Sequence, residues 1–74
     1  MVHTIQTRTG GTLLTWFRRP GDELHRGDAL AFLETAPGGY DVIEAMEGGI
    51  FDAQLVDGSE PILQGAAVAT LRVR

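Results

Sequence analysis

The residue types that carry most enzyme and metal chemistry are scarce in this 74-residue chain. It contains no Cys, so no thiolate is available to attack a substrate or to bind a metal. Its six Lys and Arg residues are all Arg, so no side-chain amine can form a Schiff base or an amide link to a cofactor. The only Ser, Ser59, falls in a predicted turn, and no Ser-His-Asp triad is predicted. We therefore expect no catalytic residue and no enzyme activity.

The two histidines and the aspartates that follow glycine point to surface and turn roles. His3 and His25 lack acidic neighbours at the spacing of metal ligands, and no Cys accompanies them, so no metal site is predicted. Asp22 and Asp28 each follow a Gly, where a short carboxylate hydrogen-bonds turn amides with its own side chain. We favour that structural role over acid–base chemistry or Ca²⁺ binding.

The remaining aromatic and basic positions do not indicate a nucleic-acid site. Trp16 is expected to pack on the core rather than to serve as a ligand platform. Arg18-Arg19, and Arg72 with Arg74, are expected to be solvated rather than to bind phosphate. Ten acidic residues against six basic ones give a net charge of −4, which argues against nucleic acid as a partner.

Glycine divides the chain into short runs of the length of β-strands, and no run keeps a helical apolar stripe. The clearest predicted strands are Thr12–Phe17, Ala29–Glu34, Ile50–Val56 and Ala67–Val73, with weaker ones at Asp41–Ala45 and His3–Thr7. The fold class is therefore all-β. With 43% hydrophobic residues, the chain is expected to form one folded domain over residues 1–74. No run is long enough to cross a bilayer and no signal peptide is recognised, so we expect a cytoplasmic protein without a membrane partner.

The sequence contains an internal repeat. Gly10–Phe17 aligns with Gly48–Leu55, and Gly27–Leu33 with Gly65–Leu71, both at an offset of 38 residues. Between them, Gly21 aligns with Gly58 at an offset of 37. Because neither copy can bury its apolar face alone, the two copies must close on each other. We expect a pseudo-two-fold barrel or sandwich with its termini near one end and the Gly38-Gly39 link at the other.

These residues resemble the lipoyl and biotinyl carrier domains from about residue 5 to residue 72. The shared positions are Gly11-Thr12, Trp16, Gly21-Asp22, Leu24, Gly27-Asp28, Leu30 and Glu34-Thr35, then Gly49, Gly58 and Val68–Leu71. The resemblance implies a flattened β-barrel, or barrel-sandwich hybrid, of two four-stranded sheets with quasi-two-fold symmetry. That architecture agrees with the internal repeat.

The carrier families present a lysine on the hairpin that follows the position of Glu34, in Glu-Thr-Asp-Lys-Ala or Glu-Ala-Met-Lys-Met. An enzyme attaches lipoate or biotin to that lysine. The hairpin here reads Glu34-Thr35-Ala36-Pro37-Gly38-Gly39-Tyr40. Pro37 stands at the lysine position, and Gly38 is the other candidate for the tip because the hairpin looks one residue longer. Neither has an amine, so the resemblance implies a degenerate carrier with no covalent cofactor.

A second segment, Glu44-Ala45-Met46-Glu47, looks like the biotin tetrapeptide with its lysine changed to glutamate. That tetrapeptide should follow the Gly27-Asp28 signal by about seven residues, which leads to Glu34 instead. We therefore assign residues 42–45 to the strand that leaves the hairpin.

The expected function is that of a non-acylated accessory or scaffold module that binds a partner protein or enzyme subunit, or a second copy of itself. Candidate partner contacts are Pro37, Gly38, Gly39 and Tyr40, because an exposed aromatic side chain often anchors an interface. An inert turn is the alternative role for this hairpin. Two alternative functions are a carrier in a carboxylase or 2-oxo acid dehydrogenase-like system with atypical cofactor handling, and a small regulatory ligand-binding module.

Overall fold

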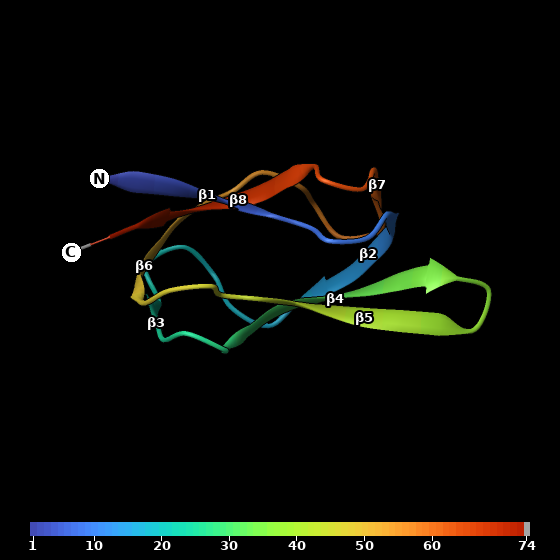
Figure 1. Ribbon diagram of the computed structural model, residues 1–74, viewed down its shortest axis with the longest axis horizontal. Helices are drawn as coiled ribbons and strands as arrows, with labels where there is room; N and C mark the ends of the chain where they lie inside the picture. Colours follow the sequence, from blue (N-terminus) through green and yellow to red (C-terminus); the bar gives the residue numbers. More distant parts are fainter. Residues whose placement is uncertain (74) are drawn as a thin grey trace.

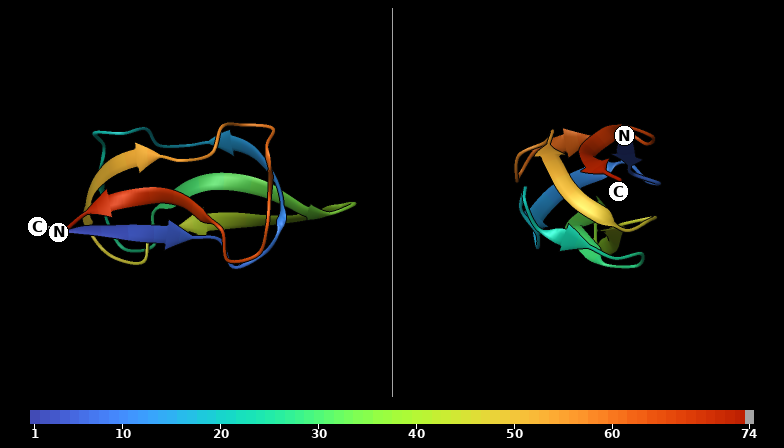
Figure 2. Two further views of the ribbon diagram at one scale, coloured as in Figure 1. Left: turned by 90° about the horizontal axis from the view of Figure 1, so that it is seen from above. Right: turned by 90° about the vertical axis from the view of Figure 1, so that its left-hand side faces the viewer.

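The computed structural model describes residues 1–73, apart from the side chain of Ala36. These residues form β-strands and no helix: β1 (Val2–Gln6), β2 (Gly11–Trp16), β3 (Glu23–Leu24), β4 (Ala29–Ala36), β5 (Gly39–Glu44), β6 (Gly49–Gln54), β7 (Pro61–Ile62) and β8 (Ala67–Arg72). They pair antiparallel into two four-stranded sheets, β1-β8-β6-β3 and β5-β4-β2-β7. Figures 1 and 2 show these sheets wrapped around one axis. The predicted all-β class with two four-stranded sheets is confirmed.

Each sheet is built from both halves of the chain. The first half supplies β2 and β4 to one sheet and lends β1 and β3 to the other. The second half supplies β6 and β8 to that other sheet and lends β5 and β7 to the first. The predicted closure of the two repeats on each other is therefore an exchange of strands, and neither sheet forms from one repeat alone.

The backbone hydrogen bonds and strand pairings of the two halves are equivalent at an offset of 38 residues, which corrects the alignment of Gly21 with Gly58. The Gly21 amide donates to the Phe51 carbonyl at 2.8 Å, and the Ser59 amide donates to the Leu13 carbonyl at 2.7 Å. Ser59 therefore occupies the place of Gly21, and both have a positive φ, 71° and 99°. The sequence alignment matched a glycine with a glycine. The backbone instead keeps the 38-residue offset and places a serine at the position with the positive φ.

The core lies between the sheets and is made of inward-facing side chains from both halves. The largest fully buried side chains are Phe51, Leu13, Leu24, Leu30, Leu33, Leu71 and Val68. Trp16 packs against this core with its ring 5.6 Å from that of Phe51, and its indole Nε1 donates to the Val56 carbonyl at 2.8 Å. The predicted packing role of Trp16 is confirmed.

Two glycines allow the long strands to approach the neighbouring backbone closely. A Cβ on Gly11 would overlap the carbonyl oxygen of Glu34, and a Cβ on Gly49 would overlap that of Arg72. These contacts are equivalent under the 38-residue offset. Any side chain at either position would push β2 from β4, or β6 from β8.

The carboxylates that follow glycine serve the turns, as predicted. Asp22 accepts a hydrogen bond from the Arg19 amide at 3.0 Å, and Asp28 accepts one from the His25 amide at 2.8 Å. Glu60, the equivalent of Asp22, accepts one from the amide of Asp57. Their role is to satisfy backbone donors in the turns around β3 and before β7.

The molecule is elongated, with extents of 38 × 17 × 17 Å. Met1 and Val73 lie together at one end, where the Val73 amide donates to the Met1 carbonyl at 2.8 Å, and the β4–β5 hairpin projects from the opposite end (Figure 1). The predicted positions of the termini and of the Gly38-Gly39 link are confirmed. Within residues 1–73, no helix is long and apolar enough to span a membrane.

Candidate functional site

The tip of the β4–β5 hairpin is a tight turn with Pro37 and Gly38 as its central residues. Ala36 pairs with Gly39, which leaves Pro37 at the first central position and Gly38, with a φ of +80°, at the second. This combination is typical of a type II turn. The register shifts between Glu34 and Ala36, so Thr35 is one extra residue in β4. β4 therefore has one more residue than β5 between the Glu34–Tyr40 pair and the turn.

The predicted hairpin residues gather at one pole and are accessible. Pro37 and Gly38 are exposed, and Gly39, Thr35 and Glu34 are half-buried. Beside the turn, a shallow hollow is lined by Gly11, Thr12, Glu34, Thr35 and Pro37. The pole offers a rigid turn, a hydroxyl group and a carboxylate to a binding partner, and no amine.

Tyr40 begins a row of three aromatic rings across the outer face of the β5-β4-β2-β7 sheet. Tyr40 is 58% exposed and stacks on Phe32, with centroids 5.2 Å apart and ring planes within 7°. The ring centroid of Phe32 in turn lies 6.4 Å from that of Phe17, and Phe17 is 52% exposed. We call these three residues the aromatic stripe. The predicted exposure of Tyr40 is confirmed, whereas sequence reasoning missed Phe32 and Phe17.

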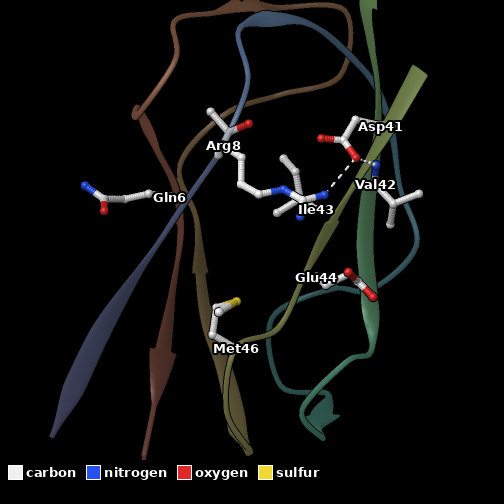
Figure 3. Close-up of a pocket in the computed structure, with 8 residues that line it drawn as sticks. Gln6, Arg8, Asp41, Val42, Ile43, Glu44 and Met46 are labelled. Carbon is white, nitrogen blue, oxygen red and sulfur yellow. Dashed lines mark hydrogen bonds and ion pairs between the residues drawn. The ribbon is translucent and has the colours of Figure 1, made fainter. Parts of the chain in front are cut away.

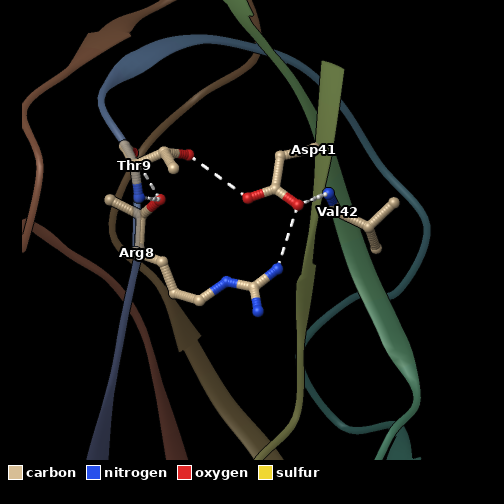
Figure 4. A network of polar contacts seen from close by, with 5 residues as sticks. Arg8, Thr9, Asp41 and Val42 are labelled. Carbon is tan, nitrogen blue, oxygen red and sulfur yellow. Dashed lines mark hydrogen bonds and ion pairs between the residues drawn. The ribbon is translucent and has the colours of Figure 1, made fainter. Parts of the chain in front are cut away.

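Asp41, next to Tyr40, ties the hairpin strand to the connection between β1 and β2. Its carboxylate accepts hydrogen bonds from the Val42 amide at 2.8 Å, from Arg8 at 3.1 Å and from the Thr9 hydroxyl at 3.3 Å (Figure 4). The Val42 hydrogen bond, together with Arg8 and Thr9 and against the effect of partial burial, holds the pKa of Asp41 below its ordinary 3.8. This contact fixes β5 against the rest of the barrel.

A groove runs between β1 and β5, which are edge strands of different sheets. Its narrow part is lined by Arg8, Ile43 and Met46, among others (Figure 3). It widens toward His3, whose ring lies 2.7 Å from the carboxylate of Glu47. That pair and the Arg8–Asp41 pair both join the two sides of the groove.

The segment Glu44–Glu47 lies at the far end of β5 from the hairpin, where the chain passes to β6. Met46 is 74% exposed there. The strand that leaves the hairpin was assigned to residues 42–45; it ends at Glu44, so the assignment is confirmed for residues 42–44, and Ala45 follows the strand.

His25 lies in an exposed turn, with its ring 3.7 Å from Asp28. No three His, Cys, Asp or Glu side chains come together in a group that could hold a metal ion, as far as residues 1–73 are concerned.

Comparison with solved structures places this architecture among known folds. The chain is similar to part of the Kluyveromyces lactis urea carboxylase, with a TM-score of 0.88 and 19% identity over 97% of the chain. It is also similar to part of a single-chain, multi-domain long-chain acyl-CoA carboxylase, with a TM-score of 0.85, 19% identity and the same coverage. The fold is therefore shared with a part of each of these two carboxylases. The chain spans 6% and 7% of those two proteins, and no family model and no curated protein matches its sequence.

Proposed function

We propose that this chain is a carrier-type domain that acts without a covalently attached cofactor, as an accessory or scaffold module for a partner enzyme. The observation that carries the proposal is the hairpin tip. It projects at the pole opposite the termini, where the carrier families present their lysine, and it consists of Pro37 and Gly38. The fold shared with domains of two carboxylases supports a partner enzyme of the carboxylase class.

The hairpin suits non-covalent recognition. The Pro37–Gly38 turn has a fixed backbone, so little conformational entropy is lost when it is bound. Tyr40 gives an exposed aromatic anchor supported by stacking on Phe32. In this proposal the hairpin pole docks on the enzyme, and nothing is transferred by a swinging arm.

Affinity capture from the host lysate tests this proposal. The native chain is the bait, and Tyr40→Val is the matched control because Val2 occupies the equivalent place in the other half. We expect the native bait to recover a carboxylase-class subunit and the Tyr40→Val bait to lose it. The chain purified from the host should have its unmodified mass. A mass increased by a lipoyl or biotinyl group, or equal capture by both baits, would contradict the proposal.

Engineered lysines test whether the tip has diverged beyond the loss of an amine. We expect Pro37→Lys and Gly38→Lys to remain unmodified by biotin and lipoate ligases, because Thr35 adds a residue before the tip and the flanking residues differ from the carrier motifs. Intact mass spectrometry measures the outcome, with a natural carrier domain as the positive control. Quantitative modification would show that only the amine is missing, and would point to a carrier ancestor with an otherwise intact ligase site.

A further inference from the structure

We propose that the outer face of the β5-β4-β2-β7 sheet docks a basic, apolar segment of a partner protein. This inference rests on the proposed function and names the chemistry of the partner. The face is defined by the aromatic stripe of Phe17, Phe32 and Tyr40, with the carboxylates of Glu34 and Glu44 beside it.

The stripe sets this face apart from the rest of the molecule. The chain has five aromatic residues, and the other two, Trp16 and Phe51, pack at the core. Phe17 and Tyr40 are each more than half exposed. Three contacting rings on an open sheet surface are costly to hydrate and are typical of an interaction site.

The other sheet provides an internal comparison because its outer face is equivalent under the 38-residue offset. There, Leu55, Thr70 and Val2 replace the three rings. Thr70 donates a hydrogen bond to Asp52 at 3.0 Å, and Arg72 pairs with the same carboxylate at 3.0 Å. That face combines a polar contact around Asp52 with the exposed aliphatic side chains of Val2 and Leu55, so the barrel architecture itself does not require an aromatic outer surface.

Glu34 and Glu44 lie on the same face as the stripe. Glu34 is two residues from Phe32 along β4, and Glu44 is four residues from Tyr40 along β5, with buried Leu33 and Ile43 on the inner side between them. Figure 3 shows Val42 and Glu44 on the side of β5 opposite to Asp41.

These two carboxylates are unlike the others in the chain. Each of the other acidic residues has a polar or charged partner, in turns, ion pairs or the Arg8–Asp41 contact. Within residues 1–73, the side chains of Glu34 and Glu44 have none. An aromatic surface flanked on two strands by unpaired carboxylates complements an apolar segment that carries cations on both sides.

Arginine fits this arrangement best among the cationic side chains. Its planar guanidinium stacks on an aromatic face and also pairs with a carboxylate through two hydrogen bonds. Arg18 and Arg19 follow Phe17 at one end of the stripe and repel cations there. The docked segment should therefore place its basic side chains over β4 and β5. It should carry no basic side chain at the Phe17 end of the aromatic stripe.

A peptide titration followed by NMR of the ¹⁵N-labelled full chain tests the proposal. The probe is a peptide with three central leucines and two arginines on each side. Its matched control has citrulline in place of arginine, which keeps the shape and removes the charge. We expect the arginine peptide to shift the amides around Phe32, Tyr40 and Glu44 and to leave those around Thr70 and Leu55 unchanged. The citrulline peptide should bind at least ten-fold more weakly.

Variants of the chain identify the contacts. Phe32→Thr with Tyr40→Val gives this face the residues of the equivalent face, and Glu34→Gln with Glu44→Gln removes only charge. Each pair should weaken binding of the arginine peptide at least ten-fold. A Leu55→Ser variant on the opposite face should bind normally. Dispersed amide spectra of every variant confirm that the barrel is folded.

Three results would overturn the inference. They are shifts centred on the other face, equal binding of the arginine and citrulline peptides, and concentration-dependent shifts of the stripe without peptide, which would assign the face to a second copy of the chain.

The outcome of this test is separable from that of the test of the proposed function. Peptide binding without host capture would contradict the accessory role alone, and Tyr40-dependent capture without peptide binding would contradict only the basic chemistry of the partner.

Discussion

Ser59 holds a left-handed backbone conformation, with a φ of 71°, at a position where the other half of the chain has Gly21. A residue with a Cβ is disfavoured there by about 1–2 kcal/mol because its Cβ crowds the following carbonyl. Serine partly compensates because its short polar side chain suits turns. The second repeat therefore contains local strain that the first avoids.

Exchanging the two residues tests this strain. Ser59→Gly should raise the free energy of unfolding by roughly 0.5–1 kcal/mol, since relief of the strained φ outweighs the added entropy of the unfolded chain. Gly21→Ser should lower it by about 1 kcal/mol or more. Urea denaturation monitored by Trp16 fluorescence measures both. If both substitutions changed the free energy of unfolding by the same amount in the same direction, the 38-residue equivalence would not extend to these turns.

Asp41 should make the stability of the folded chain depend on pH in the acid range. Its pKa is lowered in the folded chain, chiefly by the Val42 amide and also by Arg8. The carboxylate therefore stabilises the fold above pH 3.8, and this contribution is lost as the pH falls through the lower pKa of the folded state. Asp41→Asn should unfold at a lower temperature than the native chain at pH 6, and the difference should shrink below pH 3.8.

Calorimetry between pH 2 and pH 6 measures that difference. Glu44→Gln is the control, because this carboxylate has no partner within residues 1–73, and it should alter the unfolding temperature little across the range. If the difference in unfolding temperature between the native chain and Asp41→Asn did not change with pH, the contact would act by shape rather than by charge.

The roles of individual residues could be predicted where their partners are close in the sequence. Asp22 and Asp28 bond amides three residues away, so their turn roles are visible in a short stretch of sequence. Asp41 meets Arg8 across 33 positions, and His3 meets Glu47 across 44. Contacts of that kind depend on how β1 lies against β5, and no local pattern reveals them.

At the scale of strands, the close approach of β2 to β4 and of β6 to β8 depends on two glycines. Gly11→Ala and Gly49→Ala should each destabilise the chain by about 1–3 kcal/mol, because the new methyl group meets a backbone carbonyl that cannot move aside. Gly58→Ala is the matched control. Its Cβ would lie 3.6 Å from the Leu14 carbonyl, an ordinary contact, so we expect a change within about 0.5 kcal/mol.

Urea midpoints of the three alanine variants test this prediction. Similar losses for Gly11→Ala and Gly49→Ala would reflect their equivalent places in the two halves. If Gly11→Ala were as stable as Gly58→Ala, the β2–β4 contact would be looser than the structure shows.

Strands were predicted well, and features that cross strands were not. Glycine spacing located the six longer strands because each turn interrupts a short apolar run, whereas the two-residue strands β3 and β7 were not among those predicted. The aromatic stripe was missed because its three rings come from β5, from β4 and from the residue after β2, and meet diagonally. That meeting depends on pairing register, which bulges in β2 and β4 shift by single residues. Tyr40 was found because it lies beside the hairpin signal.

At the scale of the whole molecule, the exchange of strands should make folding a single cooperative event. The sheet that contains β2 and β4 also needs β5 and β7 from the second half, and the sheet that contains β6 and β8 needs β1 and β3 from the first. Trp16 shows the same dependence, since both Phe51 and the Val56 carbonyl come from the other half. Each half alone leaves its apolar face in water.

Cutting the chain at the hairpin tip tests that dependence. Residues 1–38 and 39–74, prepared separately, should each be unfolded, with Trp16 fluorescing as it does in water. Because the cut falls in an exposed turn and removes no core contact, an equimolar mixture should recover the β-sheet circular dichroism and shift Trp16 emission to the blue. Recovery should weaken on dilution, since association of two fragments replaces folding of one chain. A stably folded isolated half would show that one repeat can bury its own apolar face, and the exchange of strands would then be dispensable for folding.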